Sequence, residues 1–152
     1  SNGGNEIPKS KFDKIPWRNI SQPTAAQRSV SMYNKRQDIW SDMANSYAWD
    51  TAIVFIHKYS ENANYINTGG ISGFLNTGKL GDKACNIHDM LSNSYEWSTE
   101  YSTYVFSSGK KWKCVYRGYD NHRNTITKSL RSSSDVTDGA ILPSFRPILY
   151  FN

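Results

Sequence analysis

The residues with the clearest chemical potential lie in two segments, 85–102 and 144–151. The first segment places the carboxylates of Asp89 and Glu96 close in sequence to Trp97, and the second ends the chain as an apolar run. A carboxylate beside a large aromatic ring is partly removed from water, and a buried charge needs a partner. Catalysis, cation binding and a structural ion pair are the three roles that this pattern allows.

Catalysis has little further support in the sequence. His57, His88 and His122 stand alone and lack the spacing of metal ligands, so each is interpreted as a surface or hydrogen-bonded histidine. No nucleophile elbow, P-loop or glycine-rich dinucleotide motif is present. Cys85 and Cys114 allow one disulfide at most, and two reduced thiols are the simpler reading. We therefore expect a protein that is not an enzyme and requires no cofactor.

Composition limits the range of partners. The chain of 152 residues fits one domain, and 18 basic against 13 acidic residues give a net charge of +5, which favours acidic partners. No basic run exceeds Lys110 and Lys111, so nucleic-acid binding is not indicated. No stretch reaches the ~20 apolar residues of a membrane span. The 10 tyrosines, with many Ser and Asn, suit a loop-rich surface that binds a ligand.

Helices are predicted only in the first part of the chain. Residues 1–18 contain two prolines and are expected to form an extended arm or linker, starting with a tag remnant. Residues 24–27 have the spacing of a capping box, which predicts a helix starting there. A second helix is predicted over residues 48–59, capped by Asn45 or Ser46. The face of the first helix is expected to carry Val30, Tyr33, Gln37, Trp40 and Ala44.

Beyond Ser60 the pattern changes to short segments punctuated by glycines, which excludes long helices. A hairpin loop is predicted at residues 107–110 and a polar loop at 132–134. Pro147 indicates an edge or bulge position in the last strand. Strands rich in aromatic and β-branched residues are predicted at 101–106, 112–116 and 145–151.

Five segments, taken in order, carry a resemblance: AWDTA at 48–52, NIHDM at 86–90, SNSYEW at 92–97, VYRG at 115–118 and SFRP at 144–147. Together they resemble the formylglycine-generating sulfatase-modifying family, from about residue 25 to the end of the sequence. The resemblance implies an α+β domain of the C-type-lectin-like fold. Two N-terminal helices would pack against a small twisted antiparallel sheet with long loops, in a domain spanning residues 19–152.

The resemblance also points to a function. Oxidase members of the family carry a cysteine pair after the segment matching Arg117 and Gly118, and this chain has none there. The ligand-binding branch fits better, because it includes phage receptor-binding proteins and the variable proteins of diversity-generating retroelements. The implied partner is a protein or glycan surface ligand, met outside the cell, on a cell surface or on a virion. Candidate contacts are Tyr119, Asp120, Asn121, His122, Arg123 and Asn124, with Tyr101 and Tyr104 as neighbours.

Alternatives to this function stay open. A formylglycine-generating-type oxidase could use a rearranged site with Cys85 and Cys114, and would then need both thiols in one cleft. A structural domain of a surface or phage tail protein is the third reading. As the alternative to a binding loop, residues 119–131 form a plain polar loop. Two of the candidate contacts, Tyr101 and Tyr104, are three residues apart in a predicted strand, so one of them is expected to face the core.

In calcium-binding relatives of this family the segment around Asp89 holds a cation, and the resemblance implies a structural Ca²⁺ site. Its ligands would be the side chains of Asp89 and Glu96 and the backbone carbonyls of Ser92 and Ser94. The sequence departs from the family pattern at Ser92, where glycine is usual, and at Tyr95, where tryptophan is usual. The alternative to a cation site is a structural role for the carboxylate of this segment. It would fix the loop by accepting hydrogen bonds from backbone amides or by pairing with Arg117 or Arg146.

Overall fold

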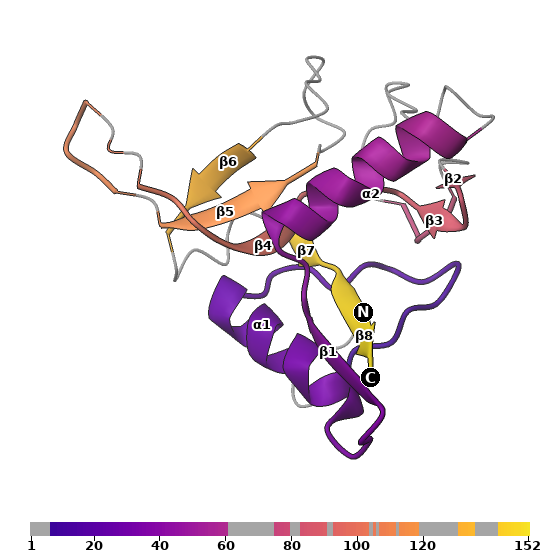
Figure 1. Cartoon of the computed structure of the whole chain (residues 1–152). Helices are drawn as coiled ribbons and strands as arrows, with labels where there is room; N and C mark the ends of the chain where they lie inside the picture. The colour runs from indigo at the N-terminus through magenta and orange to yellow at the C-terminus, as the bar shows by residue number, and fades with distance from the viewer. Residues whose placement is uncertain are drawn as a thin grey trace.

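The computed structural model describes residues 7–60, 75–79, 83–90, 93–103, 105, 107–111, 113–118, 131–135 and 143–152. These residues form two α-helices, a short 3₁₀ helix and eight strands (Figure 1). The predicted mixture of two helices with mainly antiparallel strands is therefore confirmed at this level. The elements are α1 (Gln22–Val30), η1 (Ser31–Tyr33), β1 (Ile39–Met43), α2 (Ser46–Tyr59), β2 (Lys83–Ala84), β3 (Ile87–His88), β4 (Glu96–Tyr101), β5 (Cys114–Arg117), β6 (Arg131–Ser134), β7 (Ser144–Phe145) and β8 (Pro147–Phe151).

The first helix begins earlier and ends earlier than predicted. Ser21 is its N-cap, and the side-chain oxygen of Ser21 accepts the amide N–H of Thr24 at 3.4 Å, so the predicted capping box at Thr24 is wrong. The helix ends at Val30. Trp40 lies in β1 rather than on the helix face, because β1 pairs with the C-terminal strand β8, a distant partner that no local pattern reveals. The helix predicted through to Ala44 is therefore wrong in its second half.

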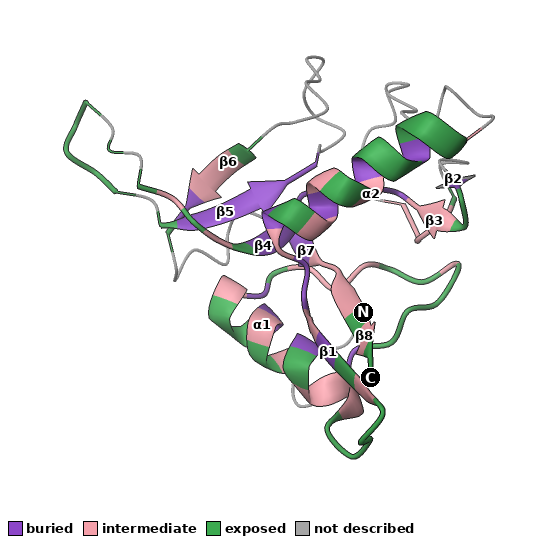
Figure 2. Ribbon diagram, viewed as in Figure 1, coloured by how far each residue is buried: buried purple, intermediate pink, exposed green. Residues whose placement is uncertain are grey.

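The second helix, α2, agrees with its prediction. Of the two candidate caps, Asn45 is the N-cap, since its side-chain oxygen accepts the amide N–H of Ala48 at 2.7 Å. Trp49, Ile53 and Ile56 form the buried stripe. Figure 2 shows both buried and exposed stretches along α2, and the buried stripe packs with Ala84 and Met90. The cap at Asn45 fixes where α2 begins, and the buried stripe fixes which side of α2 packs against the rest of the protein.

The strands form three sheets. The largest has the order β6-β5-β4-β7, and its β4–β7 pair is parallel whereas its other pairs are antiparallel. Two smaller antiparallel sheets pair β1 with β8 and β2 with β3. In Figure 1 α1 lies beside β1, and α2 lies along the larger sheet. β7 and β8 are separated by Arg146 alone, so one chain segment joins two sheets.

The predicted strands are displaced from the observed ones. The strand predicted at 101–106 is wrong: β4 ends at Tyr101, and Val105 forms only an isolated bridge with Lys111, across the turn predicted at 107–110. β5 covers the second half of the strand predicted at 112–116 and continues to Arg117. β4 starts before its predicted position because Glu96 and Trp97 pair with both β5 and β7.

The predictions for the C-terminal part of the chain were partly wrong and partly confirmed. The loop predicted at 132–134 is wrong, because Arg131–Ser134 forms β6 and pairs residue by residue with the buried strand β5. The strand predicted at 145–151 is split at Arg146 into β7 and β8. The edge position predicted for Pro147 is confirmed, since β8 is an outer strand of a two-stranded sheet. Pro147 has no N–H to contribute there.

Two hydrophobic clusters form the core. One contains Trp97 and Tyr116 from the large sheet with Ala25 from α1, and the other contains Trp49 from α2 with Met90. The indole N–H of Trp97 donates to the carbonyl of Ile20 at 2.8 Å and so ties the chain before α1 to the sheet. No helix among the described residues is long and apolar enough to cross a membrane.

Residues 7–18 contain no helix or strand, but they are bonded to the rest of the molecule. The amide of Asp13 donates to the carbonyl of Thr77 at 2.9 Å, and the amide of Thr77 donates to the carbonyl of Lys14 at 2.8 Å. Trp17 makes an edge contact with Phe145 at 5.7 Å between ring centroids. The arm thus forms one wall of a groove described below, while the domain boundary expected after residue 18 stays a prediction.

Candidate functional site

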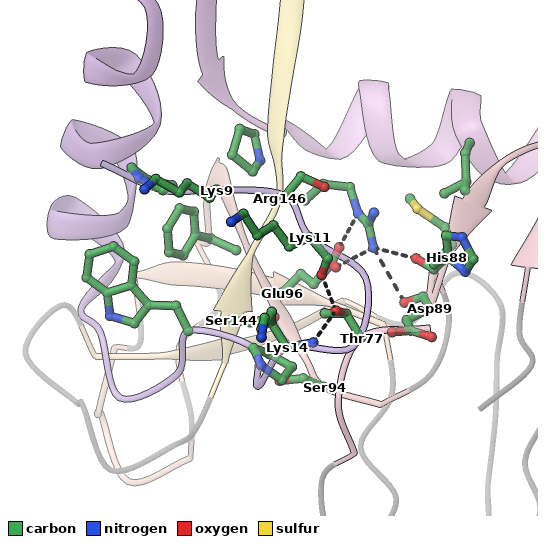
Figure 3. A pocket seen from close by; sticks show the side chains of 18 of the residues that line it. Lys9, Lys11, Lys14, Thr77, His88, Asp89, Ser94, Glu96, Ser144 and Arg146 are labelled. Atoms are coloured by element: carbon green, nitrogen blue, oxygen red, sulfur yellow. Dashed lines mark hydrogen bonds and ion pairs between the residues drawn. The ribbon is translucent and has the colours of Figure 1, made fainter. Parts of the chain in front are cut away.

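Arg146 connects the segment 144–151, in which it lies, to the segment 85–102. Its Nε donates to Glu96 Oε2 at 3.0 Å and its Nη2 donates to Glu96 Oε1 at 2.6 Å. Nη2 also donates to the carbonyl of His88 at 3.1 Å, as Figure 3 shows. Of the two arginines predicted as possible partners of Glu96, Arg117 and Arg146, it is Arg146 that pairs with it. A bidentate pair of this kind fixes orientation as well as charge, and it joins β4 to the turn between β7 and β8.

Asp89 and Asn93 shape the turn that precedes β4. Both have left-handed backbones, with φ of 53° and 71°, a region that Asp and Asn tolerate better than most residues. Asp89 Oδ2 accepts the amide N–H of Gly78 at 2.8 Å, and the side chain of Asn93 bonds both the amide and the carbonyl of Leu75 at 3.1 Å. Asp89 Oδ1 is buried and has no hydrogen-bond partner in the described part of the chain.

The predicted calcium ligands are only partly placed. Ser92 lies outside the described residues, and the hydroxyl of Ser94 donates to the carbonyl of Tyr95 at 3.0 Å. Both carboxylate oxygens of Glu96 are held by arginine, which leaves Asp89 Oδ1 as the unengaged carboxylate oxygen of the described ligands. Because Ca²⁺ takes six to eight oxygens, these described residues fit it poorly. No group of three His, Cys, Asp or Glu side chains suited to a metal occurs where the structure is described. The calcium site stays a prediction.

A groove of about 760 Å³ opens between the arm, the Asp89 turn and β8 (Figure 3). Its volume lies within the range of ligand pockets, about 300–1,000 Å³. Apolar side chains from α2, η1 and both C-terminal strands form much of its wall, and three lysines of the arm join them. Its lining includes Lys9, Lys11 and Lys14 of the arm and Pro147, Ile148 and Leu149 of β8.

The polar loop predicted to bind the ligand lies outside the described residues. This applies to Tyr119, Asp120, Asn121, His122, Arg123 and Asn124, and also to Tyr104. Tyr101 is described: it ends β4 and its side chain is 62% exposed, so it is available to a ligand rather than part of the core. The structure does describe both ends of the segment that contains the loop.

Asp50 of α2 clamps those two ends together. Arg117, the last residue of β5, and Arg131, the first residue of β6, are register partners. Asp50 Oδ1 accepts Arg117 Nη2, and Asp50 Oδ2 accepts Arg131 Nη2 at 2.6 Å. Arg131 Nε also donates to Glu100 at 3.2 Å. Gly118 then leaves β5 with φ +84°, a conformation that side chains disfavour.

The clamp combines one buried and one exposed arginine. The side chain of Arg117 is wholly buried, and its Cζ lies 4.4 Å from the ring centre of Trp49, a cation–π contact. Partial burial lowers the pKa of Arg131, but the carboxylates of Asp50 and Glu100 outweigh it and raise that pKa above its usual value. Arg131 is therefore charged. Nothing in the sequence marks Asp50 as a binding residue, because a single aspartate in a helical pattern is typical of a solvated position.

The two cysteines lie in different places. Cys85 is exposed between β2 and β3, whereas Cys114 is buried at the start of β5 in the cluster that contains Trp97. Both are free thiols. Burial raises the pKa of Cys114, which keeps it protonated and unreactive. Neither cysteine lines the groove as the structure describes it.

No family model matches the sequence, and no curated protein or solved structure is significantly similar to it. The resemblance to the formylglycine-generating family, and with it the C-type-lectin-like fold, therefore stays a prediction. The function has to be inferred from the arrangement of this chain's own residues.

Proposed function

We propose that this protein is a non-catalytic ligand-binding module on a C-type-lectin-like scaffold. Residues 119–124 would contact a protein or glycan surface ligand, with Tyr101 beside them. The setting would be outside the cell, on a cell surface or on a virion, where a retroelement-diversified variable protein would work. The proposal separates two roles, a fixed scaffold and a segment that recognises the partner.

The clamp at Asp50 carries this proposal. It holds Arg117 and Arg131 in register, so residues 119–130 begin and end at neighbouring points of one hairpin. The buried Arg117 and its contact with Trp49 tie this base to the core. A binding segment anchored at both ends can vary in sequence without disturbing the sheet, which is how rigid scaffolds carry binding loops.

The residue types of the segment suit recognition. Tyr contributes a large amphipathic surface with few torsions to freeze, and Asn, Asp and His supply adaptable hydrogen bonds. Tyr119 and Asn121 combine these two properties within three positions. The net charge of +5 favours ligands of acidic character, such as sialylated or sulfated glycans and acidic protein surfaces.

The test uses a glycan array and an array of cell-surface proteins, probed with the full chain. The double variant Tyr119→Ala/Asn121→Ala is expected to lose the wild-type signals while keeping the wild-type melting temperature. A matched control, Tyr47→Ala/Asn34→Ala, removes the same residue types from exposed positions elsewhere and should bind like the wild type. Wild-type binding by the Tyr119/Asn121 variant would remove this loop from consideration as the site.

The oxidase alternative gains no support from the geometry. Such an enzyme needs two thiols in one cleft, and here Cys114 is buried in the sheet core while Cys85 is exposed at a separate two-stranded ladder. The raised pKa of Cys114 also disfavours the thiolate that the chemistry would use. We therefore carry the binding module forward as the single proposal.

A further inference from the structure

The outer edge of β8 offers unused backbone hydrogen-bonding groups. In the described part of the chain, β8 pairs with β1 alone. The amide of Ala44 donates to the carbonyl of Arg146, and the amide of Asn152 donates to the carbonyl of Asp38. Because antiparallel bonds alternate along a strand, the even-numbered residues of β8 face β1. The N–H and C=O groups of Leu149 and Phe151 therefore point the other way, and the described residues provide no partner for them.

This free edge lies in the groove. Pro147, Ile148 and Leu149 all line it, and successive side chains of a strand point to opposite faces of a sheet. The groove therefore runs along the first half of β8, where the outward N–H and C=O groups of Leu149 lie. Residues 8–12 of the arm also line the groove. A strand laid against β8 would be about 4.8 Å from it, with side chains directed alternately to the two faces.

The charges around the edge are unbalanced. Lys9, Lys11 and Lys14 line the groove, and none of them forms an ion pair with an acidic side chain of the described residues. Asp13 lies near Lys14 but forms its ion pair with Lys79. The groove's Arg146 is already neutralised by Glu96. A partner bearing negative charge would complement the three lysines, and their exposed position makes this attraction sensitive to salt.

We propose that this groove is a second binding site, which takes an extended acidic peptide segment as an added strand on β8. Backbone bonds to Leu149 and Phe151 would supply affinity, and the lysines would select acidic side chains. Apolar side chains at alternate positions of the peptide would pack on the groove walls. The proposal makes no use of residues 119–124, so the two sites can fail separately.

The probe is a fluorescein-labelled peptide, capped at both ends, in which glutamate and valine alternate. Saturable binding is expected by fluorescence anisotropy, with a Kd below about 1 mM. Two altered peptides test the two features: one carries N-methyl groups on alternate backbone amides, and the other has lysine in place of glutamate. Both are expected to bind roughly tenfold or more weakly, since one lacks strand pairing and the other lacks charge complementarity.

Variants of the protein test the same features from the other side. Leu149→Pro removes an outward N–H that β1 does not use, whereas Leu149→Ala keeps it, so only the proline variant should lose binding strongly. Charge reversal of Lys9, Lys11 and Lys14 to glutamate should weaken binding, and reversal of Lys35, which lies outside the groove, should not. If the proline variant does not fold, the N-methylated peptide still decides the role of the edge.

Three results would overturn the proposal. The first is an N-methylated peptide that binds like the parent, which would exclude strand addition. The second is absence of saturable binding by the glutamate peptide. The third is tight binding of oligogalacturonate that is unaffected by Leu149→Pro, because the groove would then recognise acidic glycans and not a peptide backbone.

Discussion

The ion pair between Glu96 and Arg146 gives the sharpest stability prediction. The Glu96 side chain is 9% exposed and the Arg146 side chain 28% exposed. Substitution Glu96→Gln keeps the shape of the side chain but removes its charge. The guanidinium then loses a charged acceptor in a place where water only partly replaces it.

The expected cost follows from burial. Breaking a fully buried ion pair by removing one partner costs about 3–5 kcal/mol. Here Arg146 is partly exposed and keeps the carbonyl of His88 as an acceptor, which lowers the cost to about 2–3 kcal/mol. For a domain of this size that corresponds to a fall in melting temperature of about 5–10 °C. Glu96→Ala should cost more, since it also removes packing.

A double-mutant cycle separates the pair from other effects. Free energies of unfolding are measured by urea denaturation for Glu96→Gln, Arg146→Met and the double variant, and a coupling energy of about 1–2 kcal/mol is expected. The exposed pair of Arg36 and Asp38, whose side chains are 55% and 62% exposed, is the control and should show a much smaller coupling energy. Equal coupling in the two pairs would refute the assignment of Glu96 as a structural carboxylate.

Three further outcomes are expected. Asp50→Ala should destabilise the protein by about 3 kcal/mol in urea denaturation, because it strands the buried guanidinium of Arg117, whereas Asp38→Ala at an exposed pair should have a much smaller effect; similar costs would contradict the clamp. Iodoacetamide at pH 8 should label Cys85 in the native protein and Cys114 only after unfolding, as read by mass spectrometry; native labelling of both would contradict the buried, protonated thiol. EDTA should leave the melting temperature unchanged, because arginine already neutralises Glu96, and a rise on adding calcium would support the cation site instead.

The parts of the fold that local patterns encode were predictable. α2 follows from the spacing of Trp49, Ile53 and Ile56 after a capping residue, because both signals act within a few turns of helix. β1 was missed since its partner β8 lies at the other end of the chain, and pairing at that distance leaves no local trace. Ser132–134 has the composition of a turn, but pairing with the buried strand β5 overrides that preference.

In the candidate site, too, features that local residue types indicate were predictable and contacts between distant segments were not. Pairing of Glu96 with Arg117 or Arg146 was predicted as one alternative, beside backbone amides and a cation, because a buried charge must be paired. The structure shows the pair with Arg146. The clamp at Asp50 was not foreseen, since it joins a helix to two strands whose arginines lie far away in sequence. The free edge of β8 could not be seen either, because an edge is a property of the sheet and not of the strand.

The separation of scaffold and binding segment is tested most directly by a library. Residues 119–124 are randomised in the full chain displayed on yeast, and folding is scored by surface expression and resistance to protease. As a matched comparison, residues 93–98, which include Glu96, are randomised in the same way. We expect most clones of the 119–124 library to fold like the parent. Few clones of the 93–98 library should fold. Loss of folding in most clones of the 119–124 library would contradict this separation of scaffold and binding segment.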